Sequence, residues 1–213
     1  MRRIAVALLH HPVLDRSGAV VTTAITNLDL HDIARSAHCF GLTDFFVVHP
    51  VAAQRELAER VRSHWVDGSG ARRIPDRRPP MQRLRVVDTL DAALRLLSEH
   101  PTTGDAAPPA LDERNAGEQA SGIEIWTTSA AQGEPSVMRY AEARRRLKRP
   151  GPSVLLLFGT GWGLAPELHE RATARLEPIV SPRADGFNHL SVRAAAAITF
   201  DRLLAPDSGA ASG

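Results

Sequence analysis

The chain has 213 residues, 43% of them hydrophobic and 23% charged, which predicts one domain with a substantial buried core. No apolar run approaches the roughly 18–20 residues that a membrane helix needs, and the single cysteine, Cys39, excludes an internal disulfide and favours a cytosolic protein. The net charge is only +2, but all except one of the 26 basic residues are arginines, whose guanidinium groups stay charged and fork onto phosphate or carboxylate.

The first half of the chain alternates between strand and helix patterns. Residues 3–9 form an apolar run that predicts a buried first strand rather than a signal peptide, because His10, His11 and Pro12 follow it in place of a cleavage site. The patterns that follow predict a loop at 12–26, a helix at 30–40, a strand at 45–49, a helix at 51–65, a loop at 68–80, a short strand at 84–87 and a helix at 89–99.

The second half continues the alternation after an interruption. Residues 101–121 have almost no large apolar side chains and predict a mobile insertion. The later patterns predict strands at 123–127, 153–158 and 176–180, a basic helix at 136–147, a short helix at 166–171 and a final helix at 190–204. Residues 1–204 are therefore expected to form one domain, with a disordered tail at 205–213.

This alternation predicts an α/β fold with a mostly parallel sheet and helices on both faces. In such sheets, ligands bind beyond the carboxyl ends of the strands. The segments that follow Leu9, Val48, Thr127, Phe158 and Val180 are therefore the candidate site.

Two arginine-rich segments indicate a polyanionic partner. Residues 70–85 hold six arginines against one aspartate, and residues 139–149 hold six basic residues against one glutamate. The alternative is that these charges belong to an exposed loop and a solvated helix face.

The strand predicted at 153–158 leads into a glycine-rich turn. Residues 155–164 read Leu-Leu-Leu-Phe-Gly-Thr-Gly-Trp-Gly-Leu. Glycines there let the backbone turn tightly and approach a ligand, although the spacing matches neither the dinucleotide fingerprint nor a phosphate-binding loop. The alternative is a purely structural turn with Trp162 packed on the sheet.

A second polar segment precedes the last helix, where residues 188–198 read Asn-His-Leu-Ser-Val-Arg-Ala-Ala-Ala-Ala-Ile. Asn188 could cap that helix, and the alanines would let it pack closely. His189 is of the residue type best suited to proton transfer near neutral pH, but a histidine at a helix start is also typical of a structural role.

A third segment, on the helix after the first strand, carries Asp29, Asp32 and Arg35 at three-residue spacing. Asp32 and Arg35 could simply pair with each other. The functional interpretation puts Arg35 at the mouth of the site, where it would hold a phosphate or orient the acceptor.

Together, these segments resemble the SPOUT class of S-adenosylmethionine (SAM)-dependent RNA methyltransferases. Residues 32–50, with Asp-Ile-Ala-Arg, Gly-Leu-Thr-Asp and Val-Val-His-Pro, are similar to the first motif of that class, 156–164 to the second and 188–198 to the third. The pairing of Phe-Gly-Thr-Gly-Trp-Gly-Leu with Asn-His-Leu-Ser-Val-Arg-x-Ala resembles one small bacterial subfamily. The resemblance covers nearly the whole chain apart from 101–121 and the tail.

The resemblance implies a C-terminal trefoil knot, SAM bent within it, and a homodimer in which Arg35 reaches the donor site of the other protomer. The donor-binding residues that it implies by position are Thr127, Thr128, Phe158, Gly159, Thr160, Gly161, Trp162, Gly163, Leu164, Ile179, Asn188, His189, Leu190 and Ser191.

Chemistry adds roles to these positions. The glycine turn can give backbone hydrogen bonds to an adenine and a ribose, with Leu164 and Leu190 as apolar walls. In-line methyl transfer depends on positioning, so no metal is expected. The acceptor must lose a proton, for which His189, Asp32 and Asp185 are candidate bases, whereas Arg35 suits positioning.

Two departures from the class leave the methylated atom open between a ribose 2′-O and guanine N1. Many members carry a glutamate where this chain has Gly161, and an asparagine where it has Asp29. The expected substrate is tRNA or rRNA in the cytoplasm, without membrane contact, and the candidate RNA contacts are Arg72, Arg73, Arg77, Arg78, Arg144 and Arg145. The alternatives are a non-catalytic RNA- or nucleotide-binding protein that retains the pocket, and a small-molecule methyltransferase.

Overall fold

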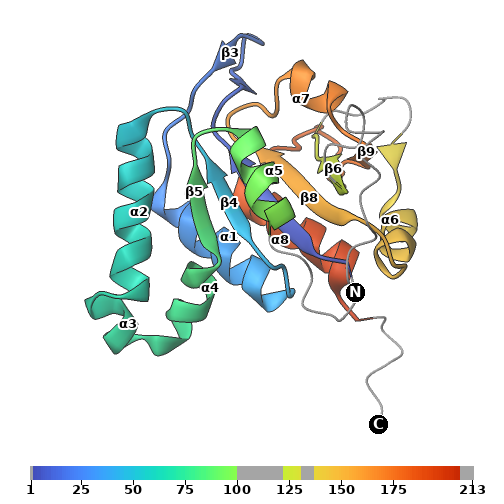
Figure 1. The fold of residues 1–213 in the computed structure, drawn as a ribbon. Coiled ribbons are helices and arrows are strands. Elements are labelled where there is room, and N and C mark those ends of the chain that lie inside the picture. The colour runs from blue at the N-terminus through green and yellow to red at the C-terminus, as the bar shows by residue number, and fades with distance from the viewer. Residues whose placement is uncertain (1, 100–121, 131–136, 207–213) are drawn as a thin grey trace, which may run out of the picture.

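The structure is a computed structural model that describes residues 2–99, 122–130 and 137–206. In this part of the chain, seven strands form one sheet in the order β5-β4-β1-β8-β6-β9-β7, and every pairing within it is parallel (Figure 1). The strands are β1 (Ile4–Leu9), β4 (Phe45–Val48), β5 (Leu84–Val87), β6 (Ile123–Thr127), β7 (Val137–Met138), β8 (Ser153–Gly159) and β9 (Ala174–Leu176). The predicted α/β fold with a parallel sheet is confirmed.

Helices cover both faces of this sheet because its central strands are apolar on both sides. In β1, Val6 and Leu8 join the core under α1 (Asn27–Cys39), α2 (Ala52–Val66), α6 (Tyr140–Leu147) and α8 (Val192–Leu204). Ala5, Ala7 and Leu9 alternate with them and join the core under α5 (Leu90–Glu99) and α7 (Pro166–Glu170). Figure 1 shows α5 on one side of the sheet and α1 and α8 on the other.

The segment 68–80, expected to be a loop, is instead helical. It forms α3 (Ser69–Arg73), a single 3-10 turn η1 (Pro75–Arg77) and α4 (Arg78–Gln82). The loop prediction rested on the glycine, proline and arginine content and was wrong. Proline is tolerated in the first turn of a helix, where the backbone N–H has no acceptor within the helix.

Smaller features of the fold also differ from the prediction. The expected loop at 12–26 contains a hairpin of β2 (Val13–Leu14) and β3 (Val20–Val21), and the expected basic helix begins with the strand β7, which pairs with β9. The strand expected at 176–180 lies instead at Ala174–Leu176 and shares only Leu176 with the prediction. It ends two residues before Pro178, which has no N–H to give to a ladder. The last helix begins at Val192 rather than at 190. The insertion expected at 101–121 and most of the tail lie outside the described residues.

The register of the central strands sets the place of the site. Leu9 at the end of β1 pairs with Gly159 at the end of β8, and Thr127 at the end of β6 pairs with Leu157. The loops after these three strands therefore leave the same edge of the sheet side by side. Within the described residues, no helix is both long and apolar enough to cross a membrane.

Candidate functional site

The glycine turn after β8 is held against the β2–β3 hairpin. The backbone N–H of Trp162 donates to the Leu14 carbonyl oxygen at 2.8 Å, and the Leu14 N–H donates to the Gly163 carbonyl oxygen at 2.9 Å. Gly161 has a φ of +61°, and a Cβ atom on it would lie 2.6 Å from the Leu14 oxygen. A Cβ atom on Gly159 would lie 2.7 Å from the Leu164 nitrogen. Glycine is therefore required at both positions by close backbone approach.

The segment that returns from β9 to α8 is fixed by Asn188. Its side-chain oxygen accepts from the Ser181 N–H at 2.8 Å, and its amide nitrogen donates to the Ile179 carbonyl oxygen at 3.0 Å. The expectation that Asn188 caps the last helix was wrong. Ser191 is the N-cap of α8, where its hydroxyl accepts from the Ala194 N–H. Asn188 instead joins the backbone of Ser181 and Ile179 within the loop.

The end of β6 forms a third wall. Thr128 donates its hydroxyl to the Leu157 carbonyl oxygen at 3.0 Å and borders the open space, whereas Thr127 is fully buried, with its hydroxyl 3.1 Å from Nδ1 of His169. Because successive side chains on a strand point to opposite faces, only one of the two threonines can face the space.

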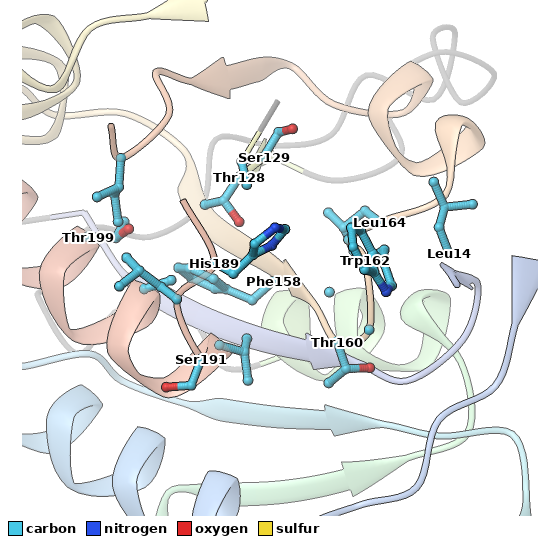
Figure 2. Close-up of a pocket in the computed structure, with 18 of the residues that line it drawn as sticks. Leu14, Thr128, Ser129, Phe158, Thr160, Trp162, Leu164, His189, Ser191 and Thr199 are labelled. Atoms are coloured by element: carbon cyan, nitrogen blue, oxygen red, sulfur yellow. The ribbon is translucent and has the colours of Figure 1, made fainter. Parts of the chain in front are cut away.

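These three walls enclose a cavity of about 710 Å³ (Figure 2). Thirteen of the fourteen expected donor-binding residues line it, and the exception is Thr127. The thirteen are residues 128, 158–164, 179 and 188–191. The volume lies within the range typical of sites for drug-sized ligands.

Sequence reasoning missed several other lining residues. Tyr140 and Thr199 face each other across the wall made by α6 and α8, with 3.3 Å between their hydroxyl oxygens. Acidic and basic side chains share the lining, which gives the cavity both signs of charge: Asp29, Glu170, Glu177, Arg175 and Arg193. None of these residues was named as a donor-binding candidate, although Arg193 belongs to segment 188–198 and Asp29 to the segment with Asp32 and Arg35, so only the fold shows that they converge.

Arg193 links the cavity to α1. Its Nη1 lies 3.3 Å from Oδ1 of Asp29, a buried carboxylate whose other oxygen accepts from the Thr26 hydroxyl at 2.6 Å. Its Nε lies 3.5 Å from Oδ2 of Asp32. Asp32 therefore pairs with Arg193 and not, as the spacing allowed, with Arg35.

Arg35 and Asp32 do not line the 710 Å³ cavity. Both border a second, open cavity of about 650 Å³ on the outer side of α1 and α8, together with His38 and Cys39. Ser191 and Arg193 line both cavities, so the two are separated by little more than the start of α8.

The other two candidate bases have different surroundings. His189 lies on the wall of the larger cavity with its ring 5.2 Å from that of Trp162 (Figure 2). Asp185 is exposed on the returning segment, where Nε of Arg183 donates to it at 2.9 Å, and this bond is the main reason that its pKa is lowered.

A pair of histidines lies beneath the hairpin, at the ends of β1 and β4. Nδ1 of His49 accepts from the Val51 N–H, so its Nε2 donates to the Thr23 carbonyl oxygen at 2.9 Å. His10 is fully buried with its ring 5.3 Å from that of His49, and neither of its ring nitrogens has a hydrogen-bond partner. Burial, reinforced by His49, lowers the pKa of His10 to about 4.

The candidate RNA contacts lie in two places. Arg72 and Arg73 on α3 and Arg78 on α4 are exposed, whereas the guanidinium of Arg77 stacks over the Trp65 ring at 4.8 Å. On α6, Arg145 is exposed, but Arg144 donates to the carbonyl oxygens of Arg202 and Ala205 and so also holds the end of α8. Among the described residues, no group of three or more His, Cys, Asp or Glu side chains could hold a metal ion.

Comparison with known proteins agrees with this geometry. The model of a family described as "SAM-dependent RNA methyltransferase" matches residues 3–205, and this chain therefore belongs to that family. The SpoU methyltransferase AviRb from Streptomyces viridochromogenes, solved with the cofactor AdoMet, has the same fold, with a TM-score of 0.50 and 13% identity over 95% of this chain and 57% of its own. The fold is thus that of the SPOUT class.

Two relatives are similar in sequence as well. A protein of Oleidesulfovibrio alaskensis named tRNA (guanine-N(1)-)-methyltransferase is 38% identical over 203 residues, which are 95% of this chain but only 42% of that protein. A protein of Aquifex aeolicus described as uncharacterized is 32% identical over 200 residues, 94% of this chain and 87% of its own. The chain therefore spans less than half of the first relative and nearly all of the second.

Proposed function

We propose that this chain transfers the methyl group of SAM to a tRNA or rRNA, with the donor held in the 710 Å³ cavity. One observation carries the proposal. Backbone from the ends of β6 and β8 and from the segment before α8 surrounds a single cavity, at the edge of the sheet where parallel α/β folds bind ligands.

The lining fits the chemistry of SAM. When bound, SAM supplies an electrophilic methyl group on a sulfonium, and it carries a positive amino group and a negative carboxylate beside an adenosine. Asp29, Glu170 and Glu177 suit the positive groups, and Arg175 and Arg193 suit the carboxylate. Gly159 and Gly161 let the turn pack closely against the backbone of Leu164 and Leu14, and this packing sets the shape of the cavity wall proposed to face the adenosine.

The acceptor side of the proposal uses residues from both cavities. His189 lies at the donor cavity and is proposed to take the proton from the acceptor, with Asp32 and Asp185 as the other candidates. Arg35 opens onto the second cavity, so it is proposed to position the acceptor in the donor site of a second protomer. This arrangement requires a homodimer that joins through the outer side of α1 and α8.

We also propose the C-terminal trefoil knot and a cytoplasmic location. The knot is supported by the path of the chain, which leaves β9 beyond β6 and returns past the glycine turn to α8, where Phe200 packs on Phe158 of β8 and Phe40. The location is supported by the substrate class. The methylated atom stays open between guanine N1 and a ribose 2′-O, because the guanine-N1 name belongs to a protein of which this chain spans 42%.

The proposal is tested by methyl transfer. The full chain is incubated with SAM labelled on its methyl group and with total bacterial RNA, and the labelled nucleoside is identified by mass spectrometry. Transfer is expected to RNA and to be lost in Arg35→Ala and His189→Ala, while Arg95→Ala, on the far side of the sheet, keeps it. Binding of S-adenosylhomocysteine without any transfer would contradict the enzyme and favour a non-catalytic RNA-binding protein.

A further inference from the structure

Two large aromatic side chains are exposed at the mouth of the 710 Å³ cavity. Trp162 is 54% exposed and Phe187 is 58% exposed, although each belongs to a loop that is hydrogen-bonded in place. The ring of His189 lies between them, 5.2 Å from the Trp162 ring and 5.5 Å from the Phe187 ring, at interplanar angles of 70° and 75°. We call Trp162, His189 and Phe187 the aromatic triad.

The triad joins two segments that are far apart in the sequence. Trp162 belongs to the turn after β8, and His189 and Phe187 belong to the segment before α8. Trp162 and His189 line the cavity, whereas Phe187 is not among the lining residues. The triad therefore runs from the wall of the donor site to the outer surface.

Exposed rings in this position are costly unless a partner covers them. The exposed part of each aromatic side chain forgoes the free energy that its burial would give. The two charged side chains near Phe187 in the sequence, Arg183 and Asp185, are paired with each other and do not cover the Phe187 ring. The rings thus offer apolar surface directly beside the cavity proposed to hold the methyl donor.

We infer that the aromatic triad is a stacking subsite for an unpaired nucleobase of the RNA, the acceptor nucleotide or its neighbour. This inference rests on the proposed function, because it takes the cavity to hold the methyl donor. An atom inside a helix cannot reach a buried donor, so the nucleotide must leave the stack, and aromatic side chains replace the stacking that it loses. Stacking of a base on an aromatic side chain strengthens binding by about fivefold or more and tolerates any sequence, since every base has two flat faces.

The experiment compares two RNAs of equal charge, with S-adenosylhomocysteine present. One is a fluorescein-labelled 12-nucleotide single-stranded RNA of mixed sequence, and the other is an abasic ribose–phosphate chain of the same length. Fluorescence anisotropy measures both affinities. The wild-type chain is expected to bind the RNA at least fivefold more tightly than the abasic chain. Phe187→Leu is expected to abolish that preference, and Phe187→Tyr to keep it.

Three controls separate this subsite from other roles. Calorimetry with S-adenosylhomocysteine should give the same affinity for Phe187→Leu and the wild type, because Phe187 does not line the donor cavity. Val180→Ala, which alters an equally exposed side chain without a ring in the same segment, should keep the preference for bases. Sedimentation should show the same oligomeric state for all variants.

Equal affinity of the wild type for the two chains would overturn the inference. So would a preference that survives in Phe187→Leu or is lost in Val180→Ala, a loss of donor affinity in Phe187→Leu, or a change in its oligomeric state. A base preference that depends on Phe187 in a chain that transfers no methyl group would support the subsite and contradict only the proposed enzyme activity. The two proposals can therefore fail separately.

Discussion

A Cβ atom on Gly161 would lie 2.6 Å from the carbonyl oxygen of Leu14, so the glycine turn and the hairpin are in direct backbone contact. The same oxygen accepts from the Trp162 N–H at 2.8 Å, which makes Leu14 the residue that fixes the shape of the turn. The shape of the 710 Å³ cavity thus depends on a hairpin in which Leu14 lies 147 positions before Gly161 in the chain.

Gly161→Ala is expected to weaken S-adenosylhomocysteine binding at least tenfold in calorimetry. The substitution adds both the strain of a positive φ, about 1–2 kcal/mol, and a collision with backbone that cannot move aside. Gly41→Ala is the matched control, because Gly41 also has a positive φ, of +76°, but nothing lies within 4 Å of its missing Cβ atom. Equal donor affinity in the two variants would show that the Leu14 contact does not shape the site.

Arg193→Met is expected to lower the free energy of unfolding by about 2 kcal/mol, because the buried Asp29 carboxylate loses a charged partner. The loss is smaller than for a fully buried pair since the Arg193 side chain is 35% exposed. Urea denaturation measures it. Donor affinity should fall as well, because Arg193 itself lines the cavity that is proposed to hold the donor.

Asp32→Asn tests which of the two carboxylates near Arg193, that of Asp29 or that of Asp32, contributes to stability. Asp32 is more exposed than Asp29 and does not line the donor cavity, so this variant should keep both donor affinity and stability close to those of the wild type. A loss as large as that of Arg193→Met would mean that Asp32, and not Asp29, is the partner that matters.

His10 is expected to make the protein less stable as the pH falls from about 6.5 to 4. Its pKa is lowered to about 4 in the folded chain, so only the unfolded chain takes up the proton over this range. The stabilisation is complete above pH 6.5, and about 3 kcal/mol of it is lost by pH 4. Burial also lowers the pKa values of His31, His38 and His49, which adds to the same trend.

Denaturation at a series of pH values tests this. His10→Phe, which keeps a buried ring but cannot titrate, should reduce the dependence of stability on pH between 6.5 and 4 and leave only the part that the other histidines contribute. His11→Phe changes an exposed neighbour and should leave the slope intact. An unchanged slope in His10→Phe would show that another group carries the dependence.

Reversing the charge of Arg72 is expected to weaken RNA binding and to reduce its dependence on salt, by a slope of about 1 for one lost phosphate contact. Arg73 and Arg78 are suitable second and third sites, whereas Arg77 is avoided because it packs on Trp65. Arg95→Glu, an equal change of charge on α5, is the control. Equal effects of Arg72→Glu and Arg95→Glu would show that Arg72 affects RNA binding only through the net charge of the protein and makes no phosphate contact of its own.

The sequence predicted the parts of the cavity wall that depend on neighbours along the chain. The glycine turn and residues 188–191 were recognisable because a buried strand, a turn and a helix start follow each other within a few positions. The direction in which a side chain points at the end of a strand was harder to predict. Thr127 and Thr128 are adjacent, yet Thr127 lies in the core and Thr128 on the cavity wall.

The rest of the site depends on tertiary contacts that no local pattern encodes. Asp29 and Arg193 meet only because α1 packs against α8, and Tyr140 meets Thr199 only because α6 packs there too. The aromatic triad was missed for the same reason, since aromatic residues are 5% of the chain and only the fold gathers Trp162 and Phe187 around His189.

A crystal structure of the chain grown with S-adenosylhomocysteine tests the donor site most directly. The proposal predicts ligand density between the glycine turn at 159–164 and residues 188–191, with backbone of the turn contacting the adenosine. Density at another place, or no binding in calorimetry under the same conditions, would contradict it.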